Sequence, residues 1–326
     1  MSILLEVAGI KTSFLTTRGY LPAIEDVSFT LEKGEVLGIV GESGCGKSVT
    51  SLSVMQLLAA NGKIQEGSIR FDGRELVGLP DSEMRKIRGN DIGVIFQEPM
   101  TSLNPVHKIG RQIGESLMMH KGMNRSQARK KSIELLKSVG IPRAEQIVDE
   151  YPHRLSGGMR QRVMIAIAMS CDPKLLIADE PTTALDVTIQ AQILDLMRKI
   201  RSERDAAILL ITHDLGVVAE MCDRVVVMYA GKVVEQGTVI EIFRKPSHPY
   251  TIGLMKSVPK LEERQERLPS IPGNVPSLEL MPKGCRFASR CAFAFEKCVQ
   301  EEPMLFPVEG QHAARCWLMN KEEVAI

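Results

Sequence analysis

The feature that most constrains how this chain can fold is a glycine-rich loop between an apolar run and a helical stretch. The loop, residues 41–48 (GESGCGKS), follows Val36–Val40 and precedes a segment with a helical pattern. This is the context of a Walker A loop, in which glycines let the backbone curl around phosphate and amides at the helix start face the anion. Lys47 adds positive charge and Ser48 can ligate Mg²⁺. The predicted nucleotide-binding residues are Gly41, Ser43, Gly44, Cys45, Gly46, Lys47, Ser48 and Val49.

Two adjacent carboxylates end a second apolar run, residues 175–180 (LLIADE). Asp179 at a strand end can help to hold Mg²⁺, and Glu180 is placed to polarise water against a γ-phosphate as a general base. On their own, these acids could equally be solvated groups at the end of a strand. Together with the upstream loop they form a Walker B pattern and predict hydrolysis of a nucleoside triphosphate.

A third motif, residues 155–162 (LSGGMRQR), stands immediately before a helical run and the acidic strand. Ser156, Gly157 and Gly158 make a second amide-lined helix start, which can hold phosphate as the first loop does. The alternative is that Ser156 is simply a helix N-cap. Two anion-binding helix starts in one chain suggest that the ligands of a nucleotide are shared.

With these motifs the chain resembles the ATP-binding cassette (ABC) ATPases over about residues 4–243. The family's other motifs are also present and in order: Gln97 after a strand at 92–96, a D-loop at 184–186, and His213 at the end of a strand at 208–212. The resemblance implies that residues 156–158 complete the γ-phosphate site of another subunit. ATP would then join two such domains, and hydrolysis would release them.

The same resemblance assigns roles to single side chains. Glu180 is the general base, Gln97 touches Mg²⁺ or the attacking water, and His213 contacts the γ-phosphate and steadies the transition state. Asp186 of the D-loop joins the nucleotide-binding set. Taken alone, Gln97 would be a plain loop residue and His213 a buried core histidine.

An aromatic ring is expected to stack on the adenine, although aromatic residues make up only 4% of the chain. Phe14 is the first candidate because of its distance upstream of the glycine-rich loop, and Tyr20 is the second. Either ring could instead be ordinary packing.

Short β-branched runs alternate with helical patterns up to about residue 242, which favours a mostly parallel sheet covered by helices. A helical insertion at about residues 98–170 includes an amphipathic helix at 128–139, closed by Gly140 and Pro142. The predicted fold class is α/β: a P-loop NTPase, ABC-type nucleotide-binding domain with antiparallel β and helical subdomains, plus a small Cys-containing C-terminal module. The predicted domains are an ABC ATPase domain at 1–242 and a loop-rich, oligopeptide-transporter-type module at 243–326.

Residues 247–251 (SHPYT) predict only a turn before a short helix, but they resemble the tail of ATPases that serve oligopeptide, dipeptide and nickel uptake. Residues 98–105 (EPMTSLNP) and 151–153 (YPH) extend this resemblance and favour peptide importers. Di- or oligopeptides are therefore the implied cargo, with nickel or opine import as alternatives. A non-transport ABC ATPase is a further alternative, although no second cassette or long coiled-coil insertion is evident. Intact Glu180 and His213 disfavour a nucleotide sensor without turnover.

Four of the seven cysteines lie between residues 285 and 316: Cys285, Cys291, Cys298 and Cys316. Their spacing lacks the close pairs that zinc usually takes and fits the thiolate ligation of iron–sulfur clusters. The resemblance implies a 4Fe–4S cluster, because peptide-importer ATPases of this branch are known with one in the matching tail. Zinc and unligated cysteines are the alternatives. Since the nucleotide motifs lie outside the tail, we expect nucleotide binding to survive loss of the cluster.

The 41 basic and 40 acidic residues leave a net charge of +1, so no global field draws the chain onto nucleic acid or anionic lipid. No apolar run reaches the ~18–20 residues of a bilayer span, and the N-terminus lacks the layout of a secretory signal, so we expect a cytosolic chain. The resemblance implies a peripheral place at the cytoplasmic face of the cell membrane. The implied partners are a second homologous ATPase subunit or a second copy of this chain, two transmembrane permease subunits and, indirectly, an extracellular peptide-binding protein, with no nucleic acid.

Overall fold

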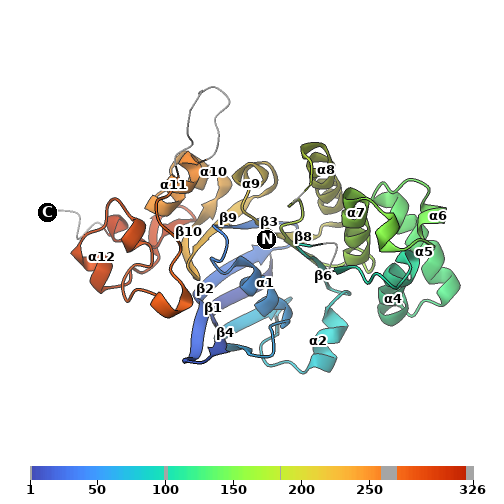
Figure 1. Ribbon diagram of the computed structural model, residues 1–326, viewed down its shortest axis with the longest axis horizontal. Helices are drawn as coiled ribbons and strands as arrows, with labels where there is room; N and C mark the ends of the chain where they lie inside the picture. The colour runs from blue at the N-terminus through green and yellow to red at the C-terminus, as the bar shows by residue number, and fades with distance from the viewer. Residues whose placement is uncertain (1, 99–101, 184, 258–269, 321–326) are drawn as a thin grey trace. The chain divides into compact units, whose positions relative to one another are not determined.

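The computed structural model describes residues 2–98, 102–183, 185–257 and 270–320 (Figure 1). The chain divides into two compact units. Unit 1 comprises Met1–Leu4, Leu31–Glu35 and Gly78–Ile211, and unit 2 comprises Leu5–Thr30, Val36–Val77 and Thr212–Ile326. Within the described ranges, no helix is both long and apolar enough to cross a membrane.

An antiparallel sheet in unit 2 has the strand order β2-β1-β4-β5. Its strands are β1 (Ile3–Thr16), β2 (Gly19–Glu32), β4 (Gly62–Phe71) and β5 (Arg74–Glu75). Leu5 of β1 lies opposite Phe71 of β4, and both side chains are buried. This sheet confirms the predicted antiparallel β subdomain.

A second sheet in unit 2 includes the strand that precedes the glycine-rich loop. In it, β3 (Val36–Val40) pairs in parallel with β9 (Arg224–Tyr229), and β10 (Lys232–Thr238) pairs antiparallel with β9. All of β3 is buried, as is usual for a parallel strand covered on both faces. Two strands of the tail, β12 (His312–Ala314) and β11 (Phe306–Glu309), continue the same sheet from β10. The sequence pattern of the tail had not indicated this continuation.

Aromatic packing joins the tail to β9 in the core of unit 2. Tyr229 and Tyr250 are fully buried with ring centroids 4.7 Å apart, and Phe287 packs edge-on against Tyr229 at 5.2 Å. The helices of unit 2 are α1 (Lys47–Met55), α9 (Leu215–Met221), α10 (Val239–Arg244), α11 (Pro249–Lys256) and α12 (Glu296–Gln300), with 3₁₀ turns at Leu278–Leu280, Ala288–Arg290 and Trp317–Met319.

Unit 1 contains three parallel strands and most of the long helices. The strand β7 (Leu175–Asp179) lies between β6 (Ile92–Ile95) and β8 (Ala207–Thr212). The helices are α2 (Asp81–Ile87), α4 (Ile109–Lys121), α5 (Arg125–Ser138), α6 (Ala144–Ile147), α7 (Gly157–Ala168) and α8 (Val187–Arg204), with a 3₁₀ turn at Pro152–Arg154. The run from α4 to α7 confirms the predicted helical subdomain.

One predicted helix boundary was wrong. The amphipathic pattern placed the start of a helix at residue 128, whereas α5 begins at Arg125. A capping box explains the earlier start, because the Asn124 side chain accepts from the Gln127 amide and the Gln127 side chain accepts from the Asn124 amide.

Candidate functional site

The glycine-rich loop leaves β3 at Val40 and enters α1 at Lys47, with no room for side chains at two of its glycines. A Cβ on Gly41 would lie 2.2 Å from the Met228 carbonyl oxygen, and one on Gly46 would lie 2.6 Å from Ile24 Cγ2. Gly41, Gly44 and Gly46 all have positive φ, at 153°, 78° and 104°. The conformation of the loop therefore depends on glycine.

Lys47 folds back over this loop. It is 6% exposed, and its Nζ donates to the carbonyl oxygens of Gly41 (2.7 Å) and Glu42 (3.1 Å). The N-cap of α1 is Gly46, which has no side chain to cap the helix, and the amides of a helix's first turn are suited to binding an anion. Burial raises the pKa of Cys45. Of the remaining predicted residues, Ser43 and Gly44 are exposed, and Ser48 and Val49 are half-buried.

Unit 1 brings Gln97 and Glu180 together. The Gln97 Nε2 donates to Glu180 Oε2 at 3.0 Å, and the Thr183 hydroxyl donates to the same oxygen at 2.9 Å. Glu180 has a φ of 47°, and its amide donates to the Ile211 carbonyl at 2.8 Å. Asp179, at the end of β7, is 8% exposed. The sequence analysis did not identify Thr183. Its position three residues after Glu180 could have indicated that its hydroxyl contacts the Glu180 carboxylate.

The Ser-Gly-Gly motif starts α7, and Ser156 is the N-cap of that helix, as the alternative interpretation of the motif predicted. The Ser156 hydroxyl accepts from the Met159 amide at 3.4 Å, which is an N-cap contact. Ser156 and Gly157 are nevertheless exposed, and a Cβ on Gly157 would meet nothing within 4 Å. Gly158 packs against Ile189 of α8, where a Cβ would lie 2.9 Å from Ile189 Cγ2.

Asp186 caps the neighbouring helix α8, with its Oδ1 accepting from the Ile189 amide at 2.9 Å. The start of α8 thus lies beside the Ser-Gly-Gly motif through Ile189. Of the predicted D-loop, Leu185 and Asp186 are described and Ala184 lies outside the described residues, as do Pro99, Met100 and Thr101 of the segment after Gln97.

His213 follows β8 in unit 2 and is exposed, so it is not the buried core histidine of the alternative reading. The next residue, Asp214, caps α9 by accepting from the amides of Gly216 (2.8 Å) and Val217 (3.3 Å). Phe14 is half-buried in β1 opposite Gly62, and Tyr20 in β2 is 48% exposed. The choice between these two rings stays a prediction.

The four cysteines of the tail line one narrow cavity of about 10 Å³ in unit 2. The other lining residues are His248, Pro249, Phe287, Ala288, Phe293, Trp317 and Leu318. Burial raises the pKa of Cys285 to about 11 and that of Cys316 to about 12, and it also raises the pKa of Cys291. Among the described residues, no three His, Cys, Asp or Glu side chains are arranged to hold a single metal ion.

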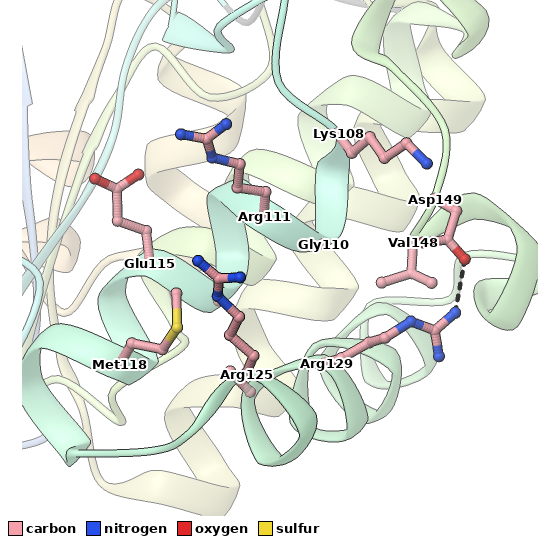
Figure 2. A pocket seen from close by; sticks show the side chains of 11 residues that line it. Lys108, Gly110, Arg111, Glu115, Met118, Arg125, Arg129, Val148 and Asp149 are labelled. Carbon is pink, nitrogen blue, oxygen red and sulfur yellow. Dashed lines mark hydrogen bonds and ion pairs between the residues drawn. The ribbon is translucent and has the colours of Figure 1, made fainter.

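A groove of about 630 Å³ in the helical subdomain has more basic than acidic residues in its lining. Figure 2 shows it between α4, α5 and the segment at 148–149, with Arg129 bonded to Asp149 at 2.6 Å. Its charged lining residues are Lys108, Arg111, Arg125, Arg129, Glu115 and Asp149. Sequence reasoning did not find this groove, because the lining comes from three separate segments.

Comparison with known protein families gives two matches. A family model described as "ABC transporter" matches residues 24–183, and one described as "Oligopeptide/dipeptide transporter, C-terminal region" matches residues 234–298. The chain is 54% identical over 323 residues to the oligopeptide transport ATP-binding protein AppD of Bacillus subtilis, covering 99% of this chain and 98% of that protein. It is 53% identical over 318 residues to the oligopeptide transport ATP-binding protein OppD of Haemophilus influenzae, covering 98% of each chain.

Among solved structures, the chain is similar to the ATP-binding cassette MJ0796, a dimer in a post-hydrolysis state with bound ADP and phosphate. The TM-score is 0.66 at 28% sequence identity, over 72% of this chain and 99% of that one.

Proposed function

Since this chain belongs to the family of ATP-binding subunits of oligopeptide import ABC transporters, we propose that it binds ATP at residues 41–48 and hydrolyses it to drive uptake of di- or oligopeptides. The observation that carries this proposal is the phosphate loop itself. Gly41 and Gly46 cannot accept a Cβ and Lys47 lies across the carbonyls of the loop, an arrangement suited to holding phosphate.

The main predicted site residues have proposed parts in that reaction. Loop amides and Lys47 bind the β- and γ-phosphates, and Phe14 or Tyr20 stacks on the adenine. Glu180 accepts the proton of the attacking water, and Gln97, which donates to Glu180 Oε2, orients that carboxylate. His213 donates to the γ-phosphate as charge develops on it. The exposure of His213 and the contact between Gln97 and Glu180 support these roles.

A magnesium ion fits the chemistry of the predicted ligands. Ser48, Gln97 and Asp179 offer a hydroxyl, an amide oxygen and a carboxylate, all of which are oxygen donors of the kind Mg²⁺ prefers. Gln97 uses its Nε2 on Glu180, so the oxygen of the same amide is the atom that would face the ion. The bound ion would neutralise charge on the β- and γ-phosphate oxygens.

We further propose that residues 156–158 and Asp186 act on ATP held by a second ATPase subunit, either a homologue or another copy of this chain. The exposure of Ser156 and Gly157 supports this, as does the similarity to MJ0796, which was solved as a dimer. We also propose that the chain works at the cytoplasmic face of the cell membrane on two permease subunits, which an extracellular binding protein supplies with peptide.

The basic groove of the helical subdomain is our candidate for permease contact. Its lining begins at Lys108, in the same unit as Gln97, the residue that touches Glu180. Its excess of cations suits an acidic permease segment.

For the tail, residues 243–326, we propose an oligopeptide-transporter-type module that holds a 4Fe–4S cluster on Cys285, Cys291, Cys298 and Cys316. Four thiols around one cavity with an otherwise mostly apolar and aromatic lining support this, because soft thiolates ligate iron and such a lining limits access of water. The cavity of about 10 Å³ is narrow, so the four thiols have to move apart when the cluster binds.

The proposed function is tested by reconstituting the chain with its permeases in lipid vesicles and measuring uptake of a labelled oligopeptide. We expect uptake that requires ATP and is lost in Lys47→Ala. Uptake of nickel or of opines in place of peptide would favour the related importers. ATP hydrolysis by the assembled complex without uptake of any of these would favour a non-transport ABC ATPase.

A further inference from the structure

Glu42 of the phosphate loop is held by two residues of the tail. Its amide donates to the Tyr250 hydroxyl at 2.8 Å. Its carboxylate accepts two hydrogen bonds from Arg290, at 2.7 Å from Nη1 to Oε2 and 3.0 Å from Nη2 to Oε1. Such a bidentate, charge-assisted pair is among the stronger polar contacts in proteins. All three residues belong to unit 2.

The position of Tyr250 is set by the sheet and not by the loop. Its amide donates to His248 Nδ1 at 3.0 Å. The amides of Ser247 and His248 donate to the carboxylate of Glu235 on β10, at 2.6 and 3.0 Å. Glu235 is fully buried and also bonds to His312 Nε2 of β12 at 2.6 Å. The residues around Tyr250 are therefore held to β10, and the Tyr250 hydroxyl contacts the loop from this position.

Arg290 is fixed in a similar way. Its side chain is 4% exposed, and its Nε and Nη2 donate to the carbonyls of Pro272 (2.8 Å) and Ile271 (3.1 Å). Its guanidinium carbon lies 5.6 Å from the centroid of the Tyr229 ring. The bond to Glu42 raises the pKa of Arg290, so the guanidinium stays charged.

These contacts matter for the loop because of its charge and because of its contact with Lys47. A triphosphate is highly negative, and the Glu42 carboxylate is one residue away from Gly41, whose carbonyl Lys47 already contacts. Lys47 also contacts the Glu42 carbonyl, so any shift of Glu42 moves an acceptor of the phosphate-binding lysine. Arg290 neutralises the Glu42 carboxylate, and Tyr250 fixes the Glu42 amide.

We propose that Arg290 and Tyr250 are positioning residues for nucleotide binding, which act through Glu42 to hold the phosphate loop in its binding conformation and to keep the Glu42 carboxylate off the path of the phosphates. The inference rests on the proposed binding of ATP at residues 41–48. It gives the tail an indirect part in nucleotide binding, through Glu42.

The test measures the dissociation constant of a fluorescent ATP analogue and the melting temperature of the full chain, purified without oxygen. We expect Arg290→Met to weaken binding about tenfold and Tyr250→Phe about threefold, from the loss of a charged and of a neutral contact respectively. Arg290→Lys keeps the charge and should recover part of the affinity. The matched control is Arg315→Met, which removes a tail arginine bonded to Asp26 at 2.8 Å and to the Val233 carbonyl at 2.9 Å, away from the loop. This control should lower the melting temperature and keep the affinity.

A double-mutant cycle tests the route through Glu42. In a Glu42→Gln background, which lacks the carboxylate charge, Arg290→Met should weaken binding by less than about twofold. A tenfold loss in both backgrounds, or an equal loss in Arg315→Met, would overturn the inference and assign the effect to general stability of the tail. Lys47→Ala distinguishes failure of the proposed ATP binding from failure of the proposed positioning role. Affinity retained in Lys47→Ala would refute ATP binding at this loop, whereas affinity lost there but unchanged in Arg290→Met would refute the positioning role alone.

Discussion

Glu180 shows how much of the proposed chemistry depends on the setting of one side chain. It is one of the non-glycine residues with a left-handed backbone, at a φ of 47°, and such conformations persist where surrounding contacts over-determine them. Here the amide is bound to Ile211 of β8 and the carboxylate to Gln97 and Thr183. The carboxylate is thus oriented before any substrate binds.

We expect Glu180→Gln to keep ATP binding and to lower turnover by about 10²–10⁴-fold, because the amide cannot accept the proton of the attacking water. The variant should then trap a closed dimer when ATP is added. The measurement is ATP hydrolysis by the assembled transporter, with Glu203→Gln on the exposed face of α8 as a carboxylate control. Turnover like that of the wild type would remove Glu180 from the role of general base.

A second prediction at this scale concerns Gly41. Gly41→Ala would place a methyl group 2.2 Å from the Met228 carbonyl, so the loop has to shift and ATP affinity should fall by at least tenfold. The loss of stability should be about 1–3 kcal/mol, as for other overpacked sites.

The control for this change is Gly73→Ala, a glycine at φ 79° with open space around it. It carries only the cost of a left-handed backbone, about 1 kcal/mol, and should keep the affinity for ATP. Chemical denaturation and binding of a fluorescent ATP analogue measure both quantities. Equal affinities of the two variants would show that the close approach at Gly41 does not shape the site.

At the scale of elements, the starts of α7 and α8 form one surface. Ser156 and Asp186 each cap their helix, and Gly158 packs on Ile189 between them. The cap contact of Ser156 and a role toward a partner's nucleotide are compatible, because Ser156 and Gly157 are both exposed.

We expect Ser156→Arg to block ATP-dependent dimerisation and to leave binding of ATP to the chain's own loop nearly intact. The added side chain occupies the surface where the partner's phosphate would sit, and the lost cap costs about 1 kcal/mol. Asn124→Arg is the matched control, since it removes the cap of α5 instead. Analytical ultracentrifugation and nucleotide titration separate the two effects. A parallel fall in binding and dimerisation would place the motif within its own chain's site.

At the scale of the whole molecule, the cysteine cavity is the feature with the most direct test. Protein purified without oxygen should be brown and contain iron and acid-labile sulfide, and serine at Cys285, Cys291, Cys298 or Cys316 should bleach it. Cys171→Ser and Cys222→Ser should keep the colour, because neither residue lines the cavity. Stoichiometric zinc without iron or sulfide would refute the cluster.

Nucleotide binding was expected to survive loss of this cluster because the motifs lie outside the tail. Tyr250 and Arg290 of the tail bond to Glu42 in the phosphate loop, so the placing of these two residues bears on that expectation. We now expect the cysteine variants to bind ATP only as long as Arg290 keeps its place beside Cys291. The proposed domain boundary at residue 242 also separates β10 from β11 and β12 in the sequence, although the three strands belong to one sheet.

The sequence by itself determined the features that are local. The loop at residues 41–48, the acidic end of β7 and the predicted strands, correct to within a residue, follow from spacing, apolar runs and glycines that act over a few neighbours. Only the tertiary structure decided what residues far apart in the chain do together. In the structure Gln97 contacts Glu180, four cysteines line one cavity, and Arg290 binds Glu42. Contacts of this kind depend on how distant segments pack within each unit. They leave no periodic signal in the sequence.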